Sequence, residues 1–185
     1  MPRTYAITGP AGSEREWWRC YDALLERNPG LVQIRVRHER LNNPEAFLAR
    51  AVERGHQQGN RVLLNGLATL ATSVGADGVH CDARSLLAAR ERPLAPPLLV
   101  GASCHDAAEL AQAVAISADF ACLSPVFPTR SHPDRPALGL VEFERLVNNC
   151  PIPVFALGGA DTQNLEAVRA AGGWGIAGIS AYWEG

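Results

Sequence analysis

The stretch between Pro153 and Gln163 has the composition of a phosphate-binding turn. A short apolar run ends in the pair Gly158-Gly159, and a helical pattern begins directly afterwards. Glycines leave backbone amides uncovered, and the amino end of a helix presents further free N–H groups with a positive dipole. The pair therefore predicts a bound phosphate at Gly158 and Gly159, although paired glycines also serve simply to turn a chain.

Two arginines beside another apolar segment, residues 31–35, are suited to the same anion. The period-two alternation of a strand places Gln33, Arg35 and Arg37 on one side, opposite apolar side chains. A guanidinium can hold a phosphate through two parallel hydrogen bonds. We therefore expect Arg35 and Arg37 to bind an anion in a cavity that Gln33 also lines. The alternative for Arg35 is an internal salt bridge.

Hydrogen-bonding side chains end two other apolar segments. Asn65 closes one of them, and Ser103 and His105 close the other. His105 is the best-placed acid or base, because the unperturbed pKa of histidine lies near neutrality. No base or nucleophile partner of His105 is visible in the sequence, so an ordinary loop histidine is the alternative.

The longest loop, residues 124–139, has the composition of a lid. It holds four prolines among hydroxyl and cationic side chains, which are Thr129, Arg130, Ser131, His132 and Arg135. Loops of this length usually form a lid or stay disordered, and we expect a lid over an anionic substrate. The chain has a net charge of −2, yet the predicted site is rich in cations, which favours a phosphorylated ligand.

These residues lie at the ends of eight short apolar segments that alternate with helical patterns. Ser13 with Glu16 and Asp106 with Glu109 have the spacing of helix capping boxes, and Asn43 precedes a proline. The alternation predicts parallel strands with right-handed crossovers, and eight of them predict an α/β fold, the (β/α)8 TIM barrel. The expected strands are Tyr5–Thr8, Leu31–Arg35, Val62–Asn65, Gly78–His80, Leu98–Ser103, Phe120–Ser124, Val154–Leu157 and Ile176–Ser180.

The barrel is expected to be a small one. An open doubly wound sheet is the alternative, but residues 8–12 lack the dinucleotide-binding glycine pattern. The 185 residues should form one domain, 1–185, below the roughly 200 to 250 residues typical of the fold. Only five residues follow the last expected strand, so the eighth helix should be missing or truncated. Trp17, Trp18, Tyr182 and Trp183 are expected to cover the gap or to form a subunit contact, with ordinary core packing as the alternative.

Composition narrows the class of protein. The net charge predicts no general attraction to nucleic acid or to an anionic membrane. No apolar run could span a membrane and no leader pattern begins the chain, so a cytoplasmic protein is expected. The five cysteines form no C-x-x-C pair, which predicts reduced thiols. A zinc site would draw its ligands from three separate strands, and no metal is expected; the candidate ligands are His80, Cys81, Cys104 and Cys122.

Five segments together carry a resemblance to a known family. They are Val32–Arg35, Gly75–His80, Pro125–Thr129, Pro153–Gly159 and Ile179-Ser180. The chain resembles the superfamily of thiamine phosphate synthase and TenI (thiazole tautomerase), small (β/α)8 barrels of thiamine biosynthesis. The synthases join hydroxymethylpyrimidine diphosphate to a thiazole phosphate and release pyrophosphate. The resemblance implies that Gly158, Gly159, Ile179 and Ser180 bind the thiazole phosphate.

The chain departs from the synthase pattern at the metal-binding acids. The synthases have Asn-Asp where this chain has Asn65-Gly66, and a second acid where Ser85 stands. These acids hold magnesium in the synthases, so no cofactor is expected unless the altered site still binds Mg²⁺. Arg37 and His132 replace lysines, while the hydroxyls of Thr129 and Ser131 are retained.

Three functions follow from the resemblance. The first is a transferase that makes thiamine phosphate, with the arginines holding the departing pyrophosphate. The second is a metal-independent TenI-like isomerase of thiazole phosphate. That branch has its proton-transfer histidine where this chain has Pro125, so His105 or His132 would move the proton. The third is a non-catalytic module that binds thiamine-related phosphates, as a homo-oligomer or with a Nudix-type hydrolase.

Overall fold

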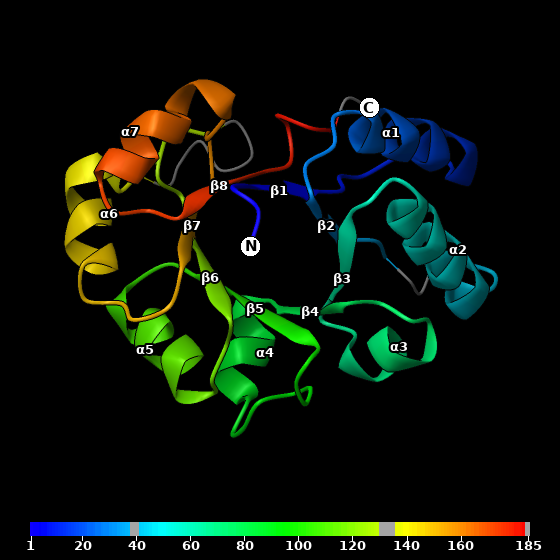
Figure 1. Ribbon diagram of the computed structural model, residues 1–185, viewed down its shortest axis with the longest axis horizontal. Coiled ribbons are helices and arrows are strands. Elements are labelled where there is room, and N and C mark those ends of the chain that lie inside the picture. The colour runs from blue at the N-terminus through cyan, green and yellow to red at the C-terminus, as the bar shows by residue number, and fades with distance from the viewer. Residues whose placement is uncertain (38–40, 130–135, 184–185) are drawn as a thin grey trace.

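Eight parallel strands close into a barrel. The computed structural model describes residues 1–37, 41–129 and 136–183, and helices surround the strands (Figure 1). Each strand pairs with the next in the chain, and β8 pairs with β1. The strands are β1 (Thr4–Ile7), β2 (Leu31–Ile34), β3 (Arg61–Asn65), β4 (Gly78–Cys81), β5 (Leu99–Cys104), β6 (Phe120–Leu123), β7 (Val154–Ala156) and β8 (Gly175–Gly178). The (β/α)8 barrel predicted from the alternation is confirmed.

Side-chain caps set where several helices begin. Ser13, Asn43 and Asp106 each accept a hydrogen bond from the amide three residues further on. In α1 and α5 the glutamate carboxylate of the predicted capping box accepts the amide of the residue before the cap.

Within the described part of the chain, no helix has the length and apolar character needed to cross a membrane. The helices are α1 (Glu14–Glu26), α2 (Pro44–Gln57), α3 (Ala68–Ser73), α4 (Ala83–Ala88), α5 (Ala107–Ala115), α6 (Gly139–Val147) and α7 (Leu165–Ala170), with a 3₁₀ turn, η2 (Thr162–Asn164).

The barrel interior is filled by large side chains from alternate positions of the strands. Tyr5, Leu63, Phe120 and Phe155 are each fully buried there. The positions between them face outward and form a second, larger cluster under the helices. This alternation places Gln33 and His80 inside the barrel, where both are almost fully buried. The interior is therefore apolar with a few enclosed polar groups.

Two aspartates stabilise the end of the barrel at which the strands begin. Asp77 and Asp119 stand just before β4 and β6, and each carboxylate accepts an amide of the preceding strand at 2.7 Å. A nitrogen-bearing side chain from a neighbouring segment completes each contact, the His56 imidazole at 2.7 Å and the Arg92 guanidinium at 2.6 Å. The same device thus fixes the start of both strands and leaves the carboxyl ends free for a site.

The described residues after β8, 179–183, form a turn. Tyr182 and Trp183 are both buried, and the Trp183 indole donates to the carbonyl of Pro10 at 2.8 Å. The rings of Trp183 and Trp17 lie 5.7 Å apart, and this end of the chain lies beside α1 (Figure 1). The burial of Trp17 and Trp183 fits both the predicted cover of the gap and ordinary core packing, so the choice between them stays a prediction. Trp18 is half-buried and stacks on the guanidinium of Arg50.

Candidate functional site

Gln33 and Asn65 meet near the carboxyl ends of β2 and β3. The Gln33 amide nitrogen donates to Oδ1 of Asn65 at 2.6 Å. Gln33 is 2 % exposed, and its Oε1 has no hydrogen-bond partner among the described residues. A buried acceptor without a donor costs about 1 to 3 kcal/mol, so this oxygen favours a ligand that donates a hydrogen bond.

His80 lies inside the barrel and is linked to Tyr5 and Ser103. Its Nδ1 is 3.1 Å from the Tyr5 hydroxyl, and its Nε2 is 2.9 Å from Oγ of Ser103. Burial lowers the pKa of His80 to about 4, with the Asp82 charge opposing this and the Arg35 charge adding to it. Both ring nitrogens are occupied, so His80 is not available for the zinc site considered from the sequence. The sequence did not identify Tyr5 as a candidate site residue, because its apolar neighbours indicate only a core position.

The Gly158-Gly159 pair packs closely on the loop after β6. Gly158 and Gly159 have φ angles of +86° and +66°, and a Cβ on Gly159 would lie 2.3 Å from the Pro128 carbonyl oxygen. The Gly158 carbonyl accepts the amide of Phe127 at 3.0 Å. The amides of Gly158 and Gly159 donate to no acceptor within the described parts of the chain. The pair therefore turns the chain against the loop and also leaves two donors free.

The start of the helix after the glycine pair is capped in part by its own side chains. η2 begins after Asp161, whose carboxylate accepts the amide of Gln163, while the Asn164 side chain accepts the amide of Asp161. The amide of Thr162, the first residue of η2, donates to no acceptor in the described ranges, so the helix start keeps a free donor as predicted. The amides of Asp161 and Gln163 are already taken.

The last strand contributes backbone rather than side-chain groups. Ile179 is half-buried and Ser180 is exposed, both directly after β8. The Ile179 carbonyl accepts the amides of Tyr182 and Trp183, which holds the turn. The amide of Ser180 donates to no acceptor in the described ranges, so it is a third free donor.

Arg35 and Arg37 follow β2 and are exposed to solvent. Neither makes an ion pair with any residue that the structure describes. The backbone of Arg35 is fixed, because its amide donates to the Thr8 hydroxyl at 2.8 Å. Two unpaired guanidinium groups beside a held backbone are suited to a bound anion. The internal salt bridge considered for Arg35 is not found there.

His105 has a partner that the sequence did not reveal. Its Nδ1 lies 2.8 Å from a carboxylate oxygen of Glu109, which is one turn along α5. The same oxygen accepts the His105 backbone amide at 2.7 Å. A carboxylate can only accept, so Nδ1 carries a proton, and Nε2 is the nitrogen left to contact a ligand.

The residues at the magnesium position do not fit the ion. Asp82 caps α4, and its Oδ1 accepts both the amide and the hydroxyl of Ser85, at 2.7 and 2.6 Å. The Ser85 hydroxyl is the main cause that lowers the pKa of Asp82. Asn65 and Gly66 supply no second carboxylate. A single carboxylate already engaged by a serine is a poor ligand set for Mg²⁺, which prefers several oxygen ligands.

The predicted lid can be placed only in part. Thr129 is half-buried at the end of the described segment after β6. Ser131 and His132 lie outside the described residues, so their predicted roles stay predictions.

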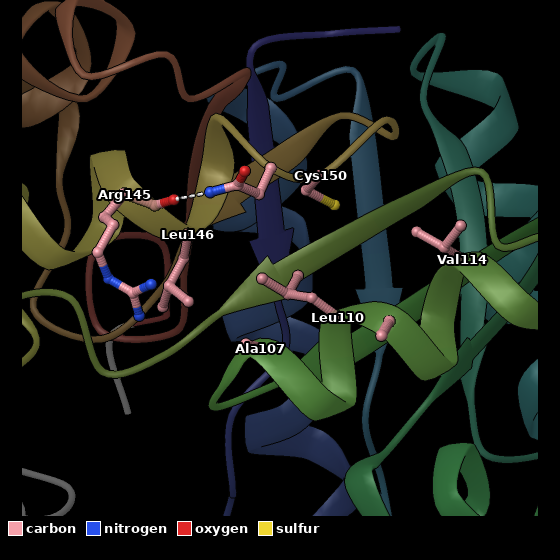
Figure 2. A pocket seen from close by; sticks show the side chains of 8 residues that line it. Ala107, Leu110, Val114, Arg145, Leu146 and Cys150 are labelled. Atoms are coloured by element: carbon pink, nitrogen blue, oxygen red, sulfur yellow. Dashed lines mark hydrogen bonds between the residues drawn. The ribbon is translucent and has the colours of Figure 1, made fainter.

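A hollow on the outside of the barrel is distinct from this site. It lies between α5 and α6, has a volume of ≈ 250 Å³ and is mostly apolar (Figure 2). Arg145 is paired with Glu142 at 2.6 Å, so the hollow has no free cation from that side chain. Its lining residues are Ala107, Leu110, Ala111, Val114, Arg145, Leu146, Asn149 and Cys150. The residues that could bind an anion or transfer a proton lie instead at the carboxyl ends of the strands.

Known proteins resemble the chain over nearly its whole length. The sequence pattern of the family described as thiamine monophosphate synthase matches residues 4–182. A protein of Aquifex aeolicus, provisionally named thiamine-phosphate synthase 2, is 32 % identical over 100 % of this chain and 99 % of its own length. The thiamine-phosphate synthase of Gloeobacter violaceus is 35 % identical over 97 % of this chain but only 52 % of its own length.

A solved structure agrees with the sequence comparison. The thiamine phosphate pyrophosphorylase of Pyrococcus furiosus superimposes with a TM-score of 0.73 at 26 % sequence identity. The match covers 97 % of this chain and 86 % of the other. Fold and sequence therefore lead to the same group of proteins.

Proposed function

The chain belongs to the thiamine monophosphate synthase family of thiamine biosynthesis, and we propose that it binds a thiazole phosphate at the carboxyl ends of its strands. We propose further that it couples this ligand to hydroxymethylpyrimidine diphosphate. The observation that carries the proposal is the pair of free amides at Gly158 and Gly159. The free amide of Ser180 on the next strand is the third donor in the proposed phosphate site.

The arginines have a separate part in the coupling. A C–N bond forms between the thiazole nitrogen and the pyrimidine methylene as the C–O bond to diphosphate breaks. The electron pair leaves on pyrophosphate, whose charge grows in the transition state. Arg35 and Arg37 are unpaired within the described residues, and we assign them to that charge. Because no proton moves, this step needs no base.

The transferase proposal is tested by binding and turnover together. Isothermal titration should show binding of thiazole phosphate and, separately, of pyrophosphate, and both substrates together should yield thiamine phosphate by chromatography. Arg35→Gln should weaken pyrophosphate binding about tenfold, as expected for one lost charged contact. Arg90→Gln is the control. It also removes one arginine charge, but from an exposed position just after the carboxyl end of α4. Equal effects of the two substitutions, or no binding of either compound, would refute the site.

A second candidate function is supported by the contact of His105 with Glu109. A histidine oriented by a carboxylate can move a proton through Nε2, as isomerisation of a thiazole phosphate requires. If the chain is an isomerase, His105→Asn should abolish proton exchange into thiazole phosphate in deuterated water. Glu109→Gln keeps an acceptor for Nδ1 but removes the charge, so it should shift the pH profile of exchange. Unchanged exchange in both variants would eliminate this dyad.

A binding module without catalysis is the remaining alternative. It predicts tight binding of thiazole phosphate or thiamine phosphate with neither coupling nor exchange. Partnership with a Nudix-type hydrolase stays a prediction, and co-purification with such a domain would test it.

A further inference from the structure

Three side chains form a hydrogen-bonded line across the interior of the barrel. Tyr5 of β1 contacts Nδ1 of His80 in β4, and Nε2 of His80 contacts Oγ of Ser103 in β5. Tyr5 is fully buried and His80 is 1 % exposed, whereas Ser103 is only half-buried. The line therefore runs from the closed interior to the carboxyl end of β5, where the side chain is partly accessible.

The surroundings of Tyr5 leave its hydroxyl a single partner. The rings of Phe120 and Phe155 lie 5.4 and 5.9 Å from the Tyr5 ring and offer no acceptor in the ring plane. Among the described residues, His80 alone is within hydrogen-bond distance of this hydroxyl. Gly101 makes room for the contact, since a Cβ there would lie 2.6 Å from Nδ1. The arrangement is thus closely packed around one polar pair.

The direction of the hydrogen bonds follows from counting donors and acceptors. A neutral imidazole has one N–H and one lone pair in its plane. The Tyr5 proton needs an acceptor, and a buried hydroxyl proton without one is unfavourable. Tyr5 therefore donates to Nδ1, the ring proton sits on Nε2, and Nε2 donates to Oγ of Ser103. The lowered pKa of His80 agrees with a neutral ring near neutral pH.

We propose that Tyr5 and His80 are positioning residues that make Ser103 a hydrogen-bond donor to an anionic oxygen of the ligand. Oγ already accepts from Nε2, and no described residue accepts the Ser103 proton. That proton is left for a phosphate or diphosphate oxygen. The arrangement is the reverse of a catalytic triad, in which histidine removes the serine proton and a carboxylate holds the other ring nitrogen. Ser103 is thus a donor and not a nucleophile.

The tautomer of His80 tests the direction of the line without any ligand. Two-bond proton–nitrogen correlation on ¹⁵N-labelled protein near neutral pH should show Nε2 protonated and Nδ1 bare. His80→Gln identifies the signals by their disappearance. A proton on Nδ1, or a doubly protonated ring, would overturn the inference.

Binding of anions tests the consequence, which rests on the proposed function. Tyr5→Phe removes the donor to Nδ1 and lets the ring reverse, so Ser103 turns its proton inward. The dissociation constant of the bound anion should then rise about tenfold, measured separately for thiazole phosphate and pyrophosphate to identify which oxygen Ser103 serves. In the Ser103→Ala background, Tyr5→Phe should have no further effect. Phe155→Leu changes packing against Tyr5 without removing a hydrogen bond and is the control.

The outcomes separate the two proposals. Equal weakening by Tyr5→Phe and Phe155→Leu, or full additivity with Ser103→Ala, would overturn the positioning role. If neither anion binds to the unmodified protein, the proposed function fails and the ligand part of this inference fails with it. The tautomer would still decide which way the line runs.

Discussion

The buried ring of His80 should make the stability of the fold depend on pH. Below about pH 6.5 the unfolded chain binds a proton at His80, while the folded chain resists it until about pH 4. The unfolded state then binds more protons, so the free energy of unfolding falls as the pH falls through this window. The contribution is fully present above about pH 6.5 and is lost towards pH 4.

The size of this effect follows from the two pKa values. A pKa of about 4 in the folded chain against about 6.5 in the unfolded chain corresponds to a loss of about 3 kcal/mol by pH 4. His80 is 1 % exposed, so screening by solvent reduces this little. A loss of that size is a large share of the 5 to 15 kcal/mol, roughly, that stabilise an ordinary domain.

Urea unfolding followed by tryptophan fluorescence measures the loss. The native chain and His80→Gln are compared at several pH values between about 7 and 4. Glutamine keeps a donor and an acceptor but does not titrate, while Asp82 and Arg35, the charges that act on the ring, remain in both proteins. The native chain should lose about 3 kcal/mol more than the variant. Parallel pH dependence of the two proteins would refute the assignment of a low pKa to His80.

Three further predictions, two of them with a matched comparison variant, test the packing of the barrel. Gly159→Ala should cost about 2 kcal/mol in urea unfolding, because its φ is +66° and the new methyl meets Pro128; Gly66→Ala, at φ +67° in open space, should cost about half of that. Asp77→Ala should cost about 2 kcal/mol by leaving a strand amide without an acceptor, and Asp77→Asn, which keeps one, should cost clearly less. Trp183→Ala should cost about 3 kcal/mol through the cavity beside α1, seen as a lower melting temperature. Equal costs within either pair, or an unchanged melting temperature for Trp183→Ala, would contradict the respective reasoning.

The architecture followed from the sequence because alternation is a local property. The inward position of Gln33 depends only on the period of its own strand, and the structure buries it as expected. The strand ends were less exact: the last strand was expected over Ile176–Ser180 and is found at Gly175–Gly178. Ser180 instead opens the final turn, because the carbonyl of Ile179 bonds forward to Tyr182 and Trp183. Such contacts depend on closure of the whole barrel.

The site was less predictable than the fold for the same reason. Tyr5 and His80 are 75 positions apart, and each has the sequence context of a buried core residue. Their hydrogen bond exists only once the eight strands have closed. Glu109 was recognised as a capping residue, but a capping glutamate is expected to return to the cap amide. It bonds the preceding residue instead, and that shift of one position brings it to His105.

The position of Trp183 bears on how the protein can be handled. β8 ends at the same side of the barrel as the proposed ligand site, and Trp183 fastens the chain there through its contacts with Pro10 and with Trp17 of α1. A bulky label attached in the turn at Ser180 or Ala181 would therefore lie next to that opening and compete for its space. Arg3 leads into β1 at the opposite rim of the barrel, so a label there would leave the opening clear for every titration described above.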